Sequence, residues 1–418
     1  MSKLQELINK LCPNGVEFKP LREIGDFFGG LTGKSKEDFI DGNARFISYM
    51  NVYSNPALKL DLPDFVKIND GEKQNVVQYG DILFTGSSET PNECGMSSVV
   101  TTKPSEPLYL NSFCFGFRLI DINTFNLDFL KHLLRSYEVR SQIAKTANGV
   151  TRFNISKKLF ANIMIPVPPI EVQEEIVRIL DSFSDYAAEL QAELQARKQQ
   201  YEYYRNLLLT FNPSAYGCGT DDEQKDGVTT WGHNYKIQWK KLGEICDNMD
   251  KLRKPVTAST RISGIYPYYG ASGVVDYVNN YIFDGSYLLI SEDGANLLAR
   301  STPIAFSIYG KTWVNNHAHV LHFNSDVTRK FVEYFINNLD ISKYVSGGAQ
   351  PKLNQKKLNS IPIPIPPLEL QEKIVAILDR FETLVNDLTN GLPAEIAAVK
   401  DQYEYYRNKL LTFKKLSA

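Results

Sequence analysis

The sequence lacks several features that would assign the protein to a class at once. None of its apolar runs is long enough to cross a bilayer, and its first residues, MSKLQELINKLCPNG, lack the apolar core of a secretory signal. They instead predict a short amphipathic helix that ends at Pro13 and Gly15. The five cysteines are scattered and none forms a C-x-x-C pair, which indicates free thiols and a cytoplasmic protein. The net charge of −2 argues weakly against a simple nucleic-acid binder.

Catalytic motifs are also missing. The segment NPSAY at 212–216 does not match the [ND]-P-P-[FYW] motif of adenine methyltransferases, and we find neither a G-x-G loop for S-adenosylmethionine nor a Walker A sequence for ATP. The segment GGLTGKS is one residue too short for a phosphate-binding loop. Asp64, Glu72 and Lys73 do not have the spacing of a nuclease site. The sequence therefore predicts no catalytic residue, no metal site and no cofactor in this chain.

A long internal duplication is present. IPVPPIEVQEEIVRILDSF at 165–183 matches IPIPPLELQEKIVAILDRF at 363–381, and QYEYYRN occurs identically at 200–206 and 402–408. The second copy holds four extra residues between its matched ends. Each copy opens with a double proline followed by glutamates, and both features favour the start of a helix.

Both copies carry apolar residues at alternating steps of three and four, which is the pattern of a coiled-coil stripe. Only Arg197 interrupts the first stripe. In the second stripe, two successive spacings are both four residues, which is a stutter in the coiled-coil repeat. Gly391 and Pro393 predict a kink or break near the middle of the second helix. The second stripe consists of Ile374, Leu378, Phe381, Val385, Leu388, Leu392, Ile396, Val399, Tyr403, Tyr406, Leu410 and Phe413.

Chain connectivity predicts how the two helices pair. The first carries the chain from one globular block to another, and the second leaves the second block. If they pair, they run antiparallel, so that each tyrosine-rich end meets the Ile/Leu/Phe start of the other. Two core helices of one large domain are the alternative.

The two globular blocks enter and leave alike. FKPLREIGDF (18–27) resembles WKKLGEICDN (239–248), and GVTRFNISKKL (149–159) resembles GAQPKLNQKKL (348–358). Short strand-like runs and helical patterns lie between them. We predict an α+β fold of two similar domains with bent sheets, separated by two long helices that form an antiparallel coiled coil with pseudo-two-fold symmetry. The predicted boundaries are 1–165 for the first domain with its N-terminal helix, 166–211 for the first helix, 212–235 for a polar linker, 236–365 for the second domain and 366–418 for the second helix.

The two helix-opening motifs and the two QYEYYRN segments resemble the specificity (S) subunit of type I restriction-modification enzymes over essentially the whole chain. The resemblance implies two target recognition domains, each reading half of a bipartite, asymmetric site in double-stranded DNA. It implies helices that set the spacing and dock two methyltransferase subunits, which restriction subunits then join. It also implies a non-catalytic chain whose partners use S-adenosylmethionine, ATP and Mg²⁺. A stand-alone DNA-binding regulator or scaffold of the same architecture, without enzyme partners, remains the alternative.

The tetrapeptide AELQ occurs twice in tandem at 188–195. The family resemblance implies that such repeats set the gap between half-sites. Four helical residues add about 6 Å, close to two base pairs of duplex at roughly 3.4 Å each. A generic stretch of strong helix formers is the alternative explanation.

The candidate DNA contacts in the first block lie on polar loops beside predicted strands. Lysine and serine suit phosphate contacts, whereas arginine pairs well with guanine and asparagine or glutamine with adenine. A plain solvated turn is the alternative at each loop. The candidates are Thr32, Lys34, Ser35 and Lys36 in GGLTGKSK, Ser87 and Ser88 in FTGSSET, and Arg152 and Asn154 in the exit segment NGVTRFN.

The second block offers a basic cluster, a tyrosine pair, polar loops and two histidines. The histidines alternate along a probable strand and share a face. A metal pair is conceivable there, but no third ligand is evident, so a structural role or a polar DNA contact is favoured. The candidates are Lys251, Arg253, Lys254, Tyr268, Tyr269, Asn296 and Arg300 beside Asp293, His317 and His319, and Gln350 and Lys352 at the exit.

Four residues of the QYEYYRN motifs lie off the apolar stripe. If the stripes pair the two helices, these side chains face outward and are candidates for methyltransferase docking. Packing beneath a block is the alternative. They are Tyr203, Arg205, Tyr405 and Arg407.

Overall fold

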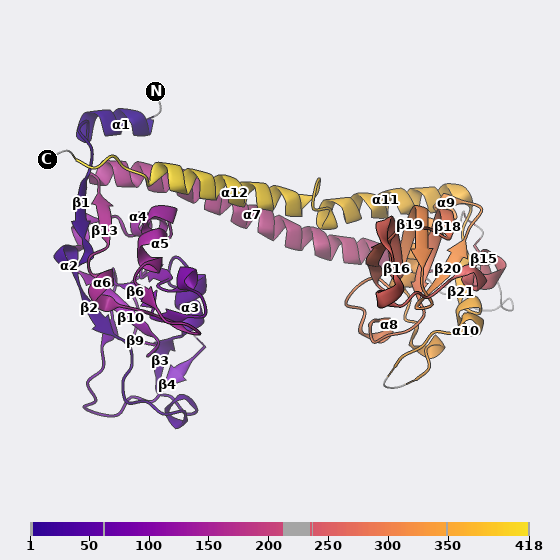
Figure 1. Ribbon diagram of the computed structural model, residues 1–418, viewed down its shortest axis with the longest axis horizontal. Helices are drawn as coiled ribbons and strands as arrows, with labels where there is room; N and C mark the ends of the chain where they lie inside the picture. The colour runs from indigo at the N-terminus through magenta and orange to yellow at the C-terminus, as the bar shows by residue number, and fades with distance from the viewer. Residues whose placement is uncertain (1–2, 62, 212–234, 236, 348–349, 417–418) are drawn as a thin grey trace. The chain divides into compact units, whose positions relative to one another are not determined.

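The computed structural model describes residues 3–61, 63–211, 235, 237–347 and 350–416 (Figure 1). Nearly all of the predicted linker 212–235 lies outside these residues, as does Cys218. The chain divides into unit 1, Met1–Gln191 with Glu395–Ala418, and unit 2, Ala192–Ala394. In the part of the chain described, every helix is too short or too polar to span a membrane. Cys12, Cys94, Cys114 and Cys246 are free thiols, as predicted.

Unit 1 is a mixed α+β body. Its strands form sheets in the orders β1-β13, β2-β10-β6-β8, β11-β12-β7 and β4-β3-β9-β5. Its helices are α1 (Lys3–Leu11), α2 (Leu21–Ile24), α3 (Tyr49–Ser54), α4 (Leu127–Leu133), α5 (Tyr137–Ala144) and α6 (Lys157–Phe160). Its strands are β1 (Glu17–Pro20), β2 (Gly25–Gly29), β3 (Ala44–Ile47), β4 (Phe65–Val66), β5 (Val76–Val77), β6 (Ile82–Thr85), β7 (Ser87–Ser88), β8 (Ser97–Val99), β9 (Leu108–Leu110), β10 (Cys114–Leu119), β11 (Ala147–Asn148), β12 (Phe153–Ile155) and β13 (Met164–Val167).

Unit 2 is built around one larger sheet. The sheet has the order β15-β20-β18-β19-β16-β17, and β14 pairs separately with β21. Its strands are β14 (Gln238–Lys241), β15 (Asp247–Asn248), β16 (Ser263–Gly270), β17 (Gly273–Val278), β18 (Phe283–Ser291), β19 (Ala305–Val314), β20 (Ala318–His322) and β21 (Pro362–Ile365). Its helices are α8 (Asn296–Ala299), α9 (Asp326–Asn338), α10 (Gln355–Asn359) and α11 (Leu368–Asn386).

The similar entries and exits of the two blocks have a structural explanation. In unit 1 the entry strand β1 pairs antiparallel with the exit strand β13, and Phe18 lies opposite Pro166. In unit 2 the entry strand β14 pairs antiparallel with the exit strand β21, and Trp239 lies opposite Pro364. The repeated segments therefore close each block with the same two-stranded element, directly before the helix that follows.

The duplicated helix segments form α7 (Ile170–Leu209), α11 and α12 (Leu392–Leu410). In unit 1, Phe183 near the start of α7 stacks on Tyr406 near the end of α12, at 5.3 Å between ring centroids. In unit 2, Tyr204 near the end of α7 stacks on Phe381 of α11 at 5.7 Å. Each tyrosine-rich end thus meets the start of the other copy, and the predicted antiparallel pairing is confirmed within each unit.

The second copy is broken, as Gly391 and Pro393 predict. Helix α11 ends at Asn386, and α12 begins at Leu392 with Pro393 in its first turn, where a proline N–H is not needed. The Asp387 carboxylate accepts hydrogen bonds from the Thr389 amide and hydroxyl at 2.7 and 2.6 Å. These bonds lower the pKa of Asp387 to about 2. One stripe residue was predicted wrongly: Leu388 lies in this break and is 80% exposed.

The start of α7 is fixed to unit 1 by a buried polar contact around His132 of α4. Its Nδ1 lies 2.8 Å from the Tyr403 hydroxyl of α12, and its Nε2 lies 2.8 Å from Asp181 of α7. Neutral imidazole suits both neighbours, since it accepts from the hydroxyl and donates to the carboxylate. Burial lowers the pKa of His132, against the opposing effect of Asp181. Lys131 also contacts Asp181, at 2.9 Å.

This contact predicts that unit 1 loses stability in mild acid. The unfolded histidine binds a proton near pH 6.5, whereas the folded one does so only at lower pH. Stability therefore falls as the pH drops below about 6.5 and on through the folded pKa. We expect the urea midpoint of unit 1 to fall between pH 7.5 and 5, and to fall less in His132→Gln. The urea midpoint of unit 1 is measured by hydrogen exchange of its amides. If it falls equally in the wild type and in His132→Gln, this role for His132 is contradicted.

Candidate functional site

In unit 1, two polar loops that are far apart in the sequence lie side by side. The exit segment NGVTRFN supplies β12 and the segment FTGSSET supplies β7, and these strands pair antiparallel. Asn154 lies opposite Ser87, and Phe153 lies opposite Ser88. Two candidate loops that were predicted independently thus form one surface.

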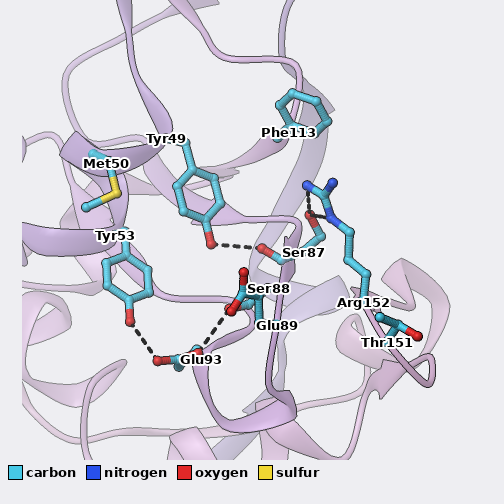
Figure 2. A pocket seen from close by; sticks show the side chains of 10 residues that line it. All are labelled: Tyr49, Met50, Tyr53, Ser87, Ser88, Glu89, Glu93, Phe113, Thr151 and Arg152. Atoms are coloured by element: carbon cyan, nitrogen blue, oxygen red, sulfur yellow. Dashed lines mark hydrogen bonds between the residues drawn. The ribbon is translucent and has the colours of Figure 1, made fainter.

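A cavity of about 580 Å³ opens beside this surface. Figure 2 shows Tyr49 and Tyr53 of α3 on one side of it and Phe113 and Arg152 on the other. The two tyrosine rings stack at 6.0 Å between centroids, and the Tyr49 hydroxyl donates to the Ser87 carbonyl at 2.8 Å. The remaining residues around the cavity are Met50, Ser88, Glu89, Glu93 and Thr151.

Arg152 is held in one orientation at the edge of this cavity. Its Nη2 donates to the Ser87 hydroxyl at 3.0 Å, and its guanidinium lies 5.2 Å from the centroid of the Phe113 ring. Glu93 is occupied by other donors, since it accepts from the hydroxyls of Tyr53 at 3.1 Å and Thr90 at 2.8 Å. The bonds from Thr90 and Tyr53 lower the pKa of Glu93.

An ion pair and several hydrogen bonds to other residues of unit 1 fix the loop that carries Thr32, Lys34, Ser35 and Lys36. The Lys34 side chain is only 6% exposed, and its ammonium lies 2.6 Å from a Glu72 carboxylate oxygen. Hydrogen bonds from the Asn69 amide and Lys34 lower the pKa of Glu72 to about 2. Ser35 donates to Asp38 through its amide and its hydroxyl, and the Thr32 amide donates to Gln74. Thr32 and Lys36 have exposed side chains that make no such contact among the residues described.

Unit 2 repeats the arrangement of unit 1 with different residues. Its exit segment reaches the loop that follows β18, where Lys352 forms an antiparallel bridge with Asp293. The Lys352 ammonium lies 3.3 Å from Glu292, and the exposed His317 ring lies 2.9 Å from Asp293. Gln350, Lys352 and His317 are exposed together at this place.

Several unit 2 candidates lie inside the protein. His319 is 1% exposed and contacts Asp250 at 2.6 Å and the Leu353 carbonyl at 2.8 Å. The ligand atoms of His319, Asp250 and Glu292 lie within 4.8 Å of one another, so the structure supplies the acidic neighbours that the sequence did not reveal. Arg253 lies between the two carboxylates, 2.7 Å from Glu292 and 3.4 Å from Asp250. The cluster is thus a partly buried ion-pair network with its own cation.

Other candidates in unit 2 form hydrogen bonds with backbone groups of the same unit. Tyr268 is 1% exposed, and its hydroxyl accepts from the Val256 amide. Arg300 donates to the carbonyls of Leu339 and Ile336, and Asn296 binds Thr302 through its amide group. Lys251 and Lys254 are exposed, and Tyr269 is partly buried.

In both QYEYYRN motifs one tyrosine faces outward and the arginine faces inward. Tyr203 and Tyr405 are 63% and 59% exposed and therefore face outward. The arginines turn inward: Arg205 donates to Asn338 of α9 at 3.1 Å, and the Arg407 guanidinium lies over the Tyr403 ring. A partner could reach the tyrosines directly, whereas the arginines pack against their own unit.

Sequence reasoning missed the aromatic side of the unit 1 cavity. Tyr49 and Tyr53 are spaced four residues apart in YMNVY, which puts them on one helix face, but nothing local connects them with Phe113 or Arg152. Glu89 and Glu93 were missed for the same reason.

The comparisons with known proteins agree on one family. Residues 13–197 and 235–398 match the family model described as "Type I restriction modification DNA specificity domain". The chain is 39% identical over 186 residues to the putative type I restriction enzyme specificity subunit S.HindORF215P of Haemophilus influenzae, covering 44% of this chain and 48% of that protein. It is 33% identical over 270 residues to the EcoR124I/EcoR124II specificity subunit of Escherichia coli, covering 60% and 61%.

Solved structures share the fold. The HsdS subunit from Thermoanaerobacter tengcongensis aligns with a TM-score of 0.53 and 18% identity, over 96% of this chain and 97% of that one. A chain from a study of complex assembly and conformational transition of the type I R-M system aligns with a TM-score of 0.60 and 18% identity, over 96% and 98%.

Proposed function

This chain belongs to the type I restriction-modification DNA specificity family, and we propose that it is the DNA-specificity subunit of such a complex. Each unit reads one half of a bipartite, asymmetric site in double-stranded DNA. The observation that carries the proposal is the repeated arrangement: in both units the exit segment meets a polar loop from the middle of the block, with Arg152 exposed in one and Lys352 in the other. Equivalent exit segments with different side chains suit two half-sites of different sequence.

The chain contributes recognition to the complex and no catalytic group. We propose two methyltransferase subunits as partners, docked on the outward tyrosines Tyr203 and Tyr405, with restriction subunits joining them in the cytoplasm. Aromatic side chains of this kind are enriched at protein interfaces. S-adenosylmethionine, ATP and Mg²⁺ belong to those partners and not to this chain.

Co-expression with methyltransferase subunits tests the proposal. We expect the proteins to purify together and to methylate a bipartite adenine-containing motif, which mapping of methylated bases in the host genome would reveal. The alternative, a stand-alone regulator, requires the chain to bind DNA specifically while no methyltransferase subunit co-purifies.

The tandem AELQ repeat gives a prediction about spacing. Deleting Ala192–Gln195 removes about 6 Å of helix rise from α7. We expect the gap between the two half-sites of the methylated motif to shorten by about two base pairs, and both half-sites to stay the same. The double substitution Glu193→Ala, Gln195→Ala preserves length at two exposed positions and should leave the gap unchanged. Altered half-site bases in the deletion variant would contradict the spacing role.

A further inference from the structure

We propose that unit 1 specifies a guanine in its half-site through Arg152, which the aromatic cavity beside β7 and β12 holds ready for a base edge. The inference rests on the proposed DNA-specificity function and adds to it one residue and one base. Phe113 and Ser87 are its positioning residues.

The first step is that Arg152 is oriented before any DNA arrives. Arginine side chains at protein surfaces are usually free to adopt many rotamers, and ordering them on binding costs free energy. Here the Nε and Nη2 atoms both donate to the Ser87 hydroxyl, at 3.3 and 3.0 Å, and the guanidinium lies over Phe113. The Nη1 atom has no partner among the described residues. The Nη1/Nη2 edge therefore remains available to a ligand.

The second step is that the surroundings favour a base over a phosphate. Glu89 and Glu93 line the same cavity, and two carboxylates disfavour the approach of a phosphate anion. Three aromatic side chains, Tyr49, Tyr53 and Phe113, also line this cavity (Figure 2). Planar aromatic side chains suit the flat, uncharged surface of a nucleobase. A phosphate contact would be expected on an open surface, at a residue such as Lys36.

The third step identifies the base. In the major groove only guanine presents two acceptors side by side, O6 and N7, and these match two parallel N–H donors of a guanidinium. Adenine would place its N6 amino group against one of those donors. Glu89 is exposed and makes no hydrogen bond among the described residues, so it can accept from the N4 amino group of the paired cytosine.

The test uses the purified complex of the full chain with its methyltransferase subunits. The wild-type motif is first mapped, and duplexes are then made that carry 7-deazaguanine, which lacks the N7 acceptor, at one guanine at a time. We expect the wild-type complex to bind about 5- to 150-fold more weakly when one particular guanine is replaced. Arg152→Gln should bind that modified duplex and the unmodified one equally, and should methylate sites with a wider choice of bases at that position than the wild type does. Phe113→Leu should show a smaller loss of the same preference.

Three outcomes would overturn the inference. The half-sites could prove free of guanine on both strands, or Arg152→Gln could retain every guanine preference of the wild type. Arg152→Gln could also weaken binding equally for all sequences, as loss of a phosphate contact does. Lys103→Gln, which removes an exposed cation of the same unit, separates a general charge effect from a base contact. Failure of the proposed function looks different, because the wild-type complex would then methylate no bipartite motif at all.

Discussion

Replacing Ile176 with aspartate is expected to unfold unit 1 while unit 2 stays folded. Ile176 lies near the start of α7 and is completely buried, in a core with Phe129 and Leu130 of α4 and Leu411 beyond α12. A carboxylate there has no partner, and the substitution also removes the packing of the isoleucine. Losing a buried isoleucine costs about 2–5 kcal/mol, and an unpaired buried charge adds to this. The total of at least about 4 kcal/mol is a large part of the stability of an ordinary domain.

The tryptophans allow the two units to be followed separately. Trp239 and Trp313 lie in unit 2, unit 1 has no tryptophan in its sequence, and Trp231 lies outside the described residues. We expect the urea transition seen by tryptophan fluorescence to remain in Ile176→Asp, while hydrogen exchange of unit 1 amides loses its protection. Ile374→Asp changes the equivalent buried residue of α11 and should have the opposite pattern. Gln191→Asp, at an exposed position of α7, is the matched control. Protected unit 1 amides in Ile176→Asp would contradict this account.

The duplicated helices were the part of the fold most open to prediction from the sequence. Their period is local, so the stripe from Ile374 to Phe413 could be read without knowing what it packs against. Antiparallel pairing then followed from connectivity. Leu388 shows the limit of this reasoning: the apolar period continues through it, but Gly391 and Pro393 end the helix, and the side chain is exposed.

The recognition loops were harder to predict, because composition does not reveal what a charged residue contacts. Lys34 and Arg253 look like surface cations in the sequence, yet each is paired with a partly buried glutamate contributed by a segment about 40 residues away. Arg152 is predicted from its residue type and from its place in an exit segment that both blocks share. What makes it distinctive, the contacts with Ser87 and Phe113, depends on the pairing of β7 with β12, which no local pattern encodes.

Gly29 and Gly30 lie at the base of the loop that carries Lys34 and Lys36. We expect substitution by alanine to change the stability of unit 1 at Gly30 and not at Gly29. Gly29→Ala is expected to be nearly neutral, since a Cβ at this position has no atom within 4 Å. At Gly30, a Cβ would lie 2.1 Å from the Asn111 carbonyl oxygen and 2.8 Å from that of Leu110. Both atoms belong to the backbone, so neither can move aside as a flexible side chain would.

Gly30→Ala is therefore expected to destabilise unit 1 by about 3 kcal/mol, the upper end of the usual cost of overpacking. The Leu110 carbonyl accepts from the Leu31 amide at 2.7 Å, and the Asn111 amide donates to the Ile47 carbonyl at 3.0 Å. Relief of the clash must stretch these bonds. The first connects β9 to the loop that carries Lys34 and Lys36, and the second connects the end of β9 to β3. Urea unfolding monitored by hydrogen exchange of unit 1 should shift for Gly30→Ala and not for Gly29→Ala. Equal stability of the two variants would mean that the chain does not need this close backbone approach to position the loop.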